Sequence, residues 1–139
     1  MADAFDGAQV AVQISDDGRF EVTMQQPGML RPLRTAELSD GTLRFLMWAV
    51  ALLTPRPPPL MVLNEPETSL HPDLLPALGR LIVRAARDTQ VIVVSHANRL
   101  IAALDAAADE DALQRIELRK DFGETRIANL DMDQIPRWQ

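Results

Sequence analysis

Two continuous apolar runs, separated by one amphipathic stretch, constrain the fold of this 139-residue chain more than any other feature. Residues 60–63 read Leu-Met-Val-Leu, and residues 91–94 read Val-Ile-Val-Val. Apolar strands without alternation are typical of a parallel sheet that is covered on both faces. Between them, residues 73–88 place leucines on one helical face and arginines on the other. Strand, helix and strand at this spacing predict a right-handed βαβ unit, and therefore the α/β class.

Further elements are expected on both sides of this unit, within a single domain that spans residues 1–139. Alternating runs predict two β-hairpins, and apolar periodicity predicts two more helices. The segment with little periodicity, which contains prolines and a glycine, is expected to be a loop. In chain order, we expect a hairpin at 8–13 and 19–25 with a turn at 15–18, a loop at 27–38, a helix capped by Ser39 and stopped at Pro55, a helix at 98–108, and a hairpin at 114–129 with a turn at 121–124.

Polar side chains come directly after each of the two apolar strands. Asn64 and Glu65 come after the first strand, and Ser95 and His96 come after the second. Ligands of open parallel sheets bind beyond the carboxyl ends of the strands. A carboxylate there can orient water or accept its proton, and an imidazole can donate to a phosphate oxygen. Either residue alone is as consistent with the start of a loop, but the two together predict a site.

A third candidate feature is the helix start at residues 38–42, Leu-Ser-Asp-Gly-Thr. A helix N-terminus offers free N–H groups and a positive dipole end, which suit a phosphate group. An ordinary serine cap explains Ser39 equally simply, and spacing alone favours that explanation.

Four segments together resemble the motifs of ABC-type ATPases, in the order and at the spacing of that family. Residues 38–42 resemble the LSGGQ signature, and 60–67 (Leu-Met-Val-Leu-Asn-Glu-Pro-Glu) resemble a Walker B strand. Residues 68–72 (Thr-Ser-Leu-His-Pro) resemble the D-loop, and 91–96 resemble the switch strand with its histidine. The amino-acid sequence of these motifs is most similar to that of the SMC- and RecF-like, AAA_21-like branch of predicted ATPases. The resemblance covers about residues 38–105, with the signature and its helix at 38–54, Walker B and D-loop at 60–72, and the switch strand and helix at 90–105.

The resemblance implies a role for each matching residue, with ATP and Mg²⁺ as cofactors. Glu65 matches the residue that polarises the attacking water, and His96 matches the residue that contacts the γ-phosphate. The signature residues, which touch nucleotide held by an opposite subunit, and the D-loop residues, which pack across the dimer, are Ser39, Asp40, Gly41, Thr42, Ser69, Leu70 and His71. For His71, an exposed loop histidine is an equal alternative.

Two departures from the family pattern qualify this resemblance. Asn64 stands where the family has an acidic residue near Mg²⁺; its amide can accept a hydrogen bond from metal-bound water but adds no negative charge. A P-loop requires Gly-x-x-x-x-Gly-Lys-Ser/Thr, and the only lysine, Lys120, lies in the late hairpin. The implied fold is therefore a three-layer, partly parallel sheet of the P-loop NTPase type, with β-hairpins at both ends and the P-loop half missing.

Composition and charge exclude several further classes of protein for this chain. The absence of cysteine excludes disulfides and thiolate chemistry, and the N-terminus has no signal-peptide pattern, so we expect a cytoplasmic chain without a membrane segment. A net charge of −6 argues against a nucleic-acid groove in this segment, while leaving DNA open for the full protein. The arginines at 80, 84 and 87 then fit a solvated helix face better than a DNA contact. Gln25 or Gln26 is a minor candidate for the family's Q-loop glutamine.

Three functions remain open at this point. The first is an ATP-hydrolysing lobe that dimerises around ATP and needs a P-loop-bearing lobe from the same or another chain, being inactive alone. The second is a non-enzymatic relic or a regulatory dimerisation module, which Asn64 and the missing P-loop favour. The third is a Toprim-like metal-dependent nuclease, for which only Glu65 and Glu67 are suitably placed at strand ends.

Overall fold

The computed structural model describes residues 4–14, 17–109 and 111–129. Its contacts divide the chain into two compact units, Met1–Ala108 and Asp109–Gln139, where the sequence predicts one domain. None of the described residues of the second unit belongs to the main apolar cluster, which is consistent with its separation from the first unit. Each unit is described by itself.

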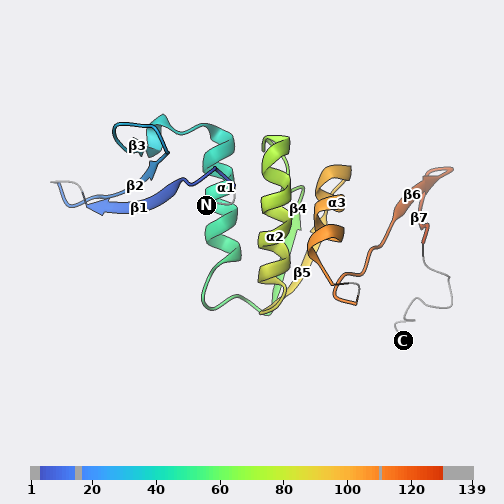
Figure 1. The fold of residues 1–139 in the computed structure, drawn as a ribbon. Coiled ribbons are helices and arrows are strands. Elements are labelled where there is room, and N and C mark those ends of the chain that lie inside the picture. The colour runs from blue at the N-terminus through green and yellow to red at the C-terminus, as the bar shows by residue number, and fades with distance from the viewer. Residues whose placement is uncertain (1–3, 15–16, 110, 130–139) are drawn as a thin grey trace. The chain divides into compact units, whose positions relative to one another are not determined.

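The first unit contains the predicted βαβ arrangement (Figure 1). Strands β4 (Leu60–Asn64) and β5 (Gln90–Val94) pair in parallel, and Asn64 lies opposite Val94. They are joined by the short 3₁₀ helix η2 (Pro72–Leu74) and by α2 (Leu75–Ala85). Helix α3 (Asn98–Ala107) follows β5. The prediction of two adjacent parallel strands with a crossover helix is confirmed.

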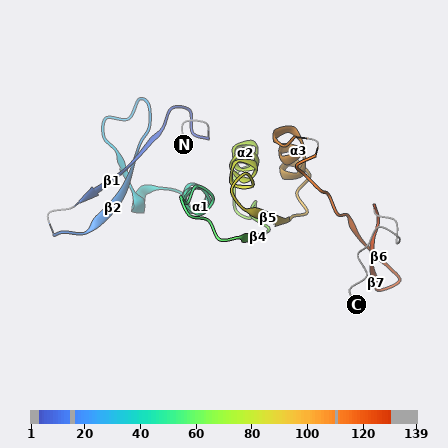
Figure 2. The same ribbon diagram turned by 90° about the horizontal axis from the view of Figure 1, so that it is seen from below.

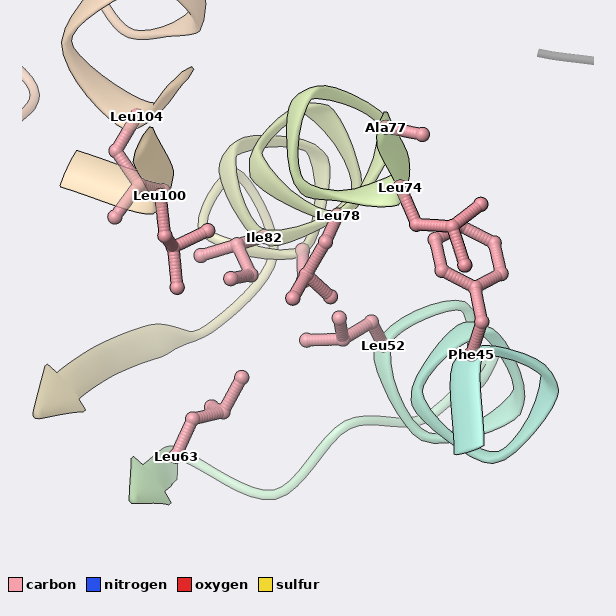
Figure 3. Close-up of a cluster of buried hydrophobic side chains, with 10 residues drawn as sticks. Phe45, Leu52, Leu63, Leu74, Ala77, Leu78, Ile82, Leu100 and Leu104 are labelled. Carbon is pink, nitrogen blue, oxygen red and sulfur yellow. The ribbon is translucent and has the colours of Figure 1, made fainter. Parts of the chain in front are cut away.

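The core of this unit lies between the sheet and three helices. Helix α1 (Asp40–Leu52) packs beside α2, and α2 packs beside α3. Figure 3 shows side chains from α1, α2, α3 and β4 meeting in one cluster. The central members are Phe45, Leu63, Leu78, Ile82 and Leu100, all at most 3% exposed. Removal of such side chains from water is the main stabilising contribution to the fold.

The sheet is covered on one face only within the described residues. Met61, Leu63, Val91 and Val93 point toward the helices and pack on the core. On the other face, Leu60, Val62, Ile92 and Val94 are 45–62% exposed. Figure 2 shows α1, α2 and α3 all on the same side of β4 and β5. The expectation that both faces of these strands are covered is therefore not met within the first unit, because none of its described elements lies on the second side.

The N-terminal hairpin is confirmed and extended by one strand. Strands β1 (Gln9–Ile14), β2 (Phe20–Gln25) and β3 (Leu33–Arg34) form an antiparallel sheet in that order. The predicted turn at 15–18 lies partly outside the described residues, since 15 and 16 are not among them.

The segment 27–38, predicted as a loop, contains β3 and the 3₁₀ helix η1 (Thr35–Glu37). An ion pair organises it: Arg31 Nη2 lies 2.7 Å from Glu37 Oε1, and Glu37 also accepts a hydrogen bond from the backbone N–H of Arg34. The hydrogen bond from Arg31 lowers the pKa of Glu37 to about 2. The prediction was wrong here because the segment is held by side chains rather than by an apolar repeat.

The second unit contains the late hairpin, with shorter strands than predicted. Strands β6 (Leu118–Asp121) and β7 (Glu124–Ile127) are antiparallel, and Asp121 lies opposite Glu124. Phe122 and Gly123 form the two-residue turn, both with positive φ (46° and 90°), as a tight hairpin turn of the primed type requires. The predicted turn is confirmed.

Candidate functional site

The first predicted site residue, Glu65, follows β4 in a strained conformation. Its φ is +46°, which is uncommon for a residue with a side chain. Its backbone N–H donates to the carbonyl of Val94 at 2.8 Å, and its carbonyl accepts from the N–H of Thr68 at 3.0 Å. These bonds hold Glu65 at the end of both strands. Strain that is kept in place by surrounding hydrogen bonds is often found at functional sites.

Glu65 and His96 lie together at the carboxyl edge of the sheet, as predicted. His96 Nδ1 is 3.3 Å from Glu65 Oε1, and the side chains are 79% and 49% exposed, respectively. The pair comes from the ends of adjacent parallel strands, which is where open α/β sheets bind ligands. The exposed carboxylate can accept a proton from water, and the imidazole beside it can donate an N–H hydrogen bond to an anionic group.

A second pair links the same two loops and was not predicted from the sequence. Ser95 Oγ donates to Glu67 Oε1 at 2.6 Å and accepts from the N–H of Ala97 at 3.1 Å. Both residues are next to, or two positions from, predicted site residues. Their contact joins positions 28 residues apart, for which a single sequence carries no local signal.

The start of α1 forms the ordinary serine cap that spacing alone favours. Ser39 Oγ accepts from the N–H of Thr42 at 3.2 Å and lies 2.9 Å from Thr42 Oγ1. Asp40 is the first residue of the helix. The cap satisfies one free N–H of the helix start, and the phosphate role of these residues remains a prediction.

The signature-like segment and the D-loop-like segment are in direct contact. A Cβ built on Gly41 would lie 3.2 Å from the backbone oxygen of Ser69. Ser69 has a φ of +64°, the second strained residue in the stretch from 65 to 69. The small size of Gly41 therefore allows the D-loop backbone to approach the start of α1.

A hollow of about 260 Å³ brings several of the predicted residues together. His71 faces it while capping η2, since its Nδ1 accepts from the N–H of Asp73 at 3.3 Å. Leu70, another D-loop residue, packs against the core. Glu65 and His96 are not part of the wall, so the predicted residues form two separate groups. The hollow is lined by Phe5, Ser39, Gly41, Thr42, His71, Asp73 and Leu74.

Gln25, the candidate Q-loop glutamine, and Asn64, the candidate residue near Mg²⁺, lie outside the wall of this hollow. Gln25 donates through Nε2 to the carbonyls of Met29 (2.8 Å) and Gln26 (3.1 Å), and thus braces the loop after β2. Asn64 is exposed and lies at the carboxyl edge, on the uncovered face of β4 by strand alternation.

Among the described residues, no three His, Cys, Asp or Glu side chains are grouped so that they could hold a metal ion. None of the described helices has both the length and the apolar composition of a membrane span.

A comparison with protein families gives one match over most of the chain. The family described as "AAA domain, putative AbiEii toxin, Type IV TA system" matches residues 3–102. A comparison with curated proteins gives no match.

Solved structures of SMC proteins have the same fold. One, titled "Structural biochemistry of ATP-driven dimerization and DNA stimulated activation of SMC ATPases", has a TM-score of 0.68 at 16% identity, covering 96% of this chain and 80% of that chain. An SMC head bound to the C-winged helix domain of ScpA has a TM-score of 0.71 at 17% identity, covering 96% and 41%. The SMC head domain from Thermotoga maritima has a TM-score of 0.63 at 22% identity, covering 94% and 44%. The chain thus spans less than half the length of two of these three.

Proposed function

The chain belongs to this AAA-domain family, and on that premise we propose that it is the ATP-hydrolysing lobe of an ABC-type, SMC- and RecF-like ATPase. In this proposal it acts only together with a P-loop-bearing lobe, and by dimerisation around ATP. The observation that carries it is the pair Glu65 and His96, which are 3.3 Å apart at the carboxyl edge of two parallel strands.

The proposed chemistry divides between the two groups of residues. Glu65 orients the attacking water and accepts its proton, while His96 donates to the γ-phosphate. The signature-like residues at the start of α1 serve nucleotide held by an opposite subunit, because a helix start offers N–H groups to phosphate oxygens. The D-loop-like residues beside them pack across the dimer. The members of this second group are Ser39, Asp40, Gly41, Thr42, Ser69, Leu70 and His71.

Asn64 is the proposed link to Mg²⁺. Magnesium in nucleotide sites is bound by few protein ligands, together with waters and phosphates, and its charge neutralises that of the phosphates. The amide oxygen of Asn64 fits a hydrogen bond from a metal-bound water, and it adds no charge. Full coordination then depends on the P-loop lobe.

The uncovered sheet face supports the need for a second lobe. Leu60, Val62, Ile92 and Val94 form a continuous apolar surface on strands whose other face is packed. Parallel sheets are stable when both faces are covered, so this surface suits an element of the P-loop lobe. Asn64 ends the same face at the carboxyl edge, where that lobe would bring the phosphates.

The assembly and location of the full protein are extrapolated from the solved relatives. ATP-driven dimerisation and stimulation by DNA are stated for SMC ATPases. We extend dimerisation to the full protein here. Any DNA contact is placed outside this segment, because its net charge is −6. A cytoplasmic location follows from this role.

The test is Glu65→Gln in a protein that carries both lobes. The amide keeps the shape of the carboxylate but cannot accept the proton, so the hydrolysis rate is expected to fall about 10²–10⁴-fold while ATP binding is retained. Turnover is measured at saturating Mg²⁺ and ATP, and Glu124→Gln in the late hairpin is the matched control. Near wild-type turnover of Glu65→Gln would show that Glu65 is not the base.

The second candidate function is a non-enzymatic module that keeps the fold for dimerisation or regulation. Asn64 favours it, because the metal-side charge of the family is absent. The same experiment separates the two candidates: a two-lobe protein that binds ATP and dimerises without turnover fits the module, and one whose turnover depends on Glu65 fits the enzyme.

A further inference from the structure

The loops that carry Glu65 and His96 are joined by a side-chain hydrogen bond that the proposed chemistry does not use. Ser95 Oγ donates to Glu67 Oε1 at 2.6 Å, and both groups are partly buried. The same hydroxyl accepts from the N–H of Ala97 at 3.1 Å. His96 therefore lies between Ser95, whose hydroxyl makes both hydrogen bonds, and Ala97, whose N–H donates to that hydroxyl.

The other loop is fixed just as tightly around Glu65. Pro66, which follows it, is fully buried. The N–H of Glu65 donates to β5 through the Val94 carbonyl at 2.8 Å, and the carbonyl of Glu67 accepts from the N–H of Leu70 at 3.0 Å. Glu67 is thus a second point, beside the Glu65–His96 pair, at which the loop after β4 contacts the loop after β5 through side chains.

The carboxylate of Glu67 is a poor choice for stability alone. Its second oxygen, Oε2, is buried and has no hydrogen-bond partner among the described residues. A buried acceptor without a donor is unfavourable, and such groups call for an explanation other than packing. A neutral side chain could accept the Ser95 hydrogen bond without burying a charge.

We propose that Glu67 and Ser95 are a positioning pair that sets the relative placement of Glu65 and His96. The inference rests on the proposed function, in which those two residues act on water and phosphate. A displacement of about 1 Å in a reacting group can cost about 10²-fold in rate, so a bond that fixes both loops has a large effect on turnover. Neither Glu67 nor Ser95 touches the reacting atoms in this proposal.

The first experiment uses the 139-residue chain and needs no activity. His71 and His96 are its only histidines, so NMR of the imidazole resonances reads the site and an internal control together. Ser95→Ala and Glu67→Ala are expected to shift the His96 resonances and to speed hydrogen exchange of the Ala97 amide, with His71 unchanged. Ser95→Thr and Glu67→Gln, which keep a hydroxyl donor and an acceptor oxygen, are expected to stay close to wild type. Unchanged His96 resonances in the alanine variants would overturn the proposal.

The second experiment measures turnover in the two-lobe protein. Each alanine variant is expected to lower kcat about 10- to 100-fold with KM for ATP within about twofold, and the double variant is expected to be no worse than either single one. Ser95→Thr and Glu67→Gln are expected to restore most of kcat. If Glu65→Gln abolishes turnover and the alanine variants do not lower it, the positioning pair is refuted and the proposed function stands. If Glu65→Gln has no effect, the proposed function fails and the NMR result alone decides the geometry.

Discussion

At the scale of single residues, the proposed site differs from the family pattern at Asn64. Asn64 carries an amide at an edge where a carboxylate would attract Mg²⁺ more strongly. We expect Asn64→Asp to raise Mg²⁺ affinity or turnover in the two-lobe protein, measured as the Mg²⁺ dependence of ATP hydrolysis. An unchanged or weakened Mg²⁺ dependence would show that Asn64 does not face the metal.

Glu37 gives a residue-scale prediction that the chain itself can test. Hydrogen bonding to Arg31 lowers its pKa from the ordinary 4.5 to about 2. A depressed folded-state pKa contributes stability above the unfolded pKa, and this contribution is lost as pH falls through about 2. The pair is exposed, so salt should weaken the effect. NMR titration of the Glu37 carboxyl is expected to show a midpoint near 2 that rises in Arg31→Gln; the same midpoint in both proteins would contradict this.

At the scale of elements, the packing of α2 on α3 depends on one glycine. A Cβ on Gly79 would lie 2.9 Å from Ala103 Cβ and 3.1 Å from the Ala103 carbonyl, closer than such atoms pack. Gly79→Ala should therefore destabilise the chain by about 1–3 kcal/mol, although alanine is the better helix former. Urea denaturation measures this, and Ala103→Gly added to Gly79→Ala should recover part of the loss. A stabilised Gly79→Ala variant would show that the helices separate easily.

Elements with a strong local pattern could be predicted from the sequence, and those without one could not. Strands β4 and β5 are continuous apolar runs, and their ends place Glu65 and His96 at one edge by topology alone. Strand β3 pairs with β2 over only two residues, and η1 is held by contacts of Glu37 with Arg31 and Arg34, so neither element leaves a periodic pattern in the sequence. The Ser95–Glu67 bond and the hollow near His71 arise from the folding of distant segments against one another, so they required the structure.

At the scale of the whole molecule, the chain is proposed to supply one part of a nucleotide site, and its sequence has no P-loop motif. The backbone cradle and lysine of a P-loop supply most contacts to the β- and γ-phosphates. We therefore expect the isolated chain to bind Mg-ATP more weakly than micromolar, as measured by calorimetric titration. Micromolar binding, about −8 kcal/mol, would reveal a phosphate site outside the motifs considered.

The uncovered sheet face gives the sharpest whole-molecule prediction, because two valines on neighbouring strands separate its role from that of the core. Val62 is 62% exposed on the uncovered face, whereas Val93 packs against the apolar cluster. In the isolated chain, Val62→Asp should change the free energy of unfolding by less than about 0.5 kcal/mol, as exposed substitutions do. Val93→Asp should destabilise it by several times more, since it buries a charge.

In the two-lobe protein, the same Val62→Asp change is expected to be severe. If the P-loop lobe covers this face, the aspartate becomes a buried, unpaired charge at the contact, and burial of an unpaired charge is strongly unfavourable. The free energy of unfolding, measured by urea denaturation, and the rate of ATP turnover should then both fall toward the values of the Val93→Asp variant. If Val62→Asp remains as stable and active as wild type when both lobes are present, the face is not the contact, and the P-loop lobe must join the chain elsewhere.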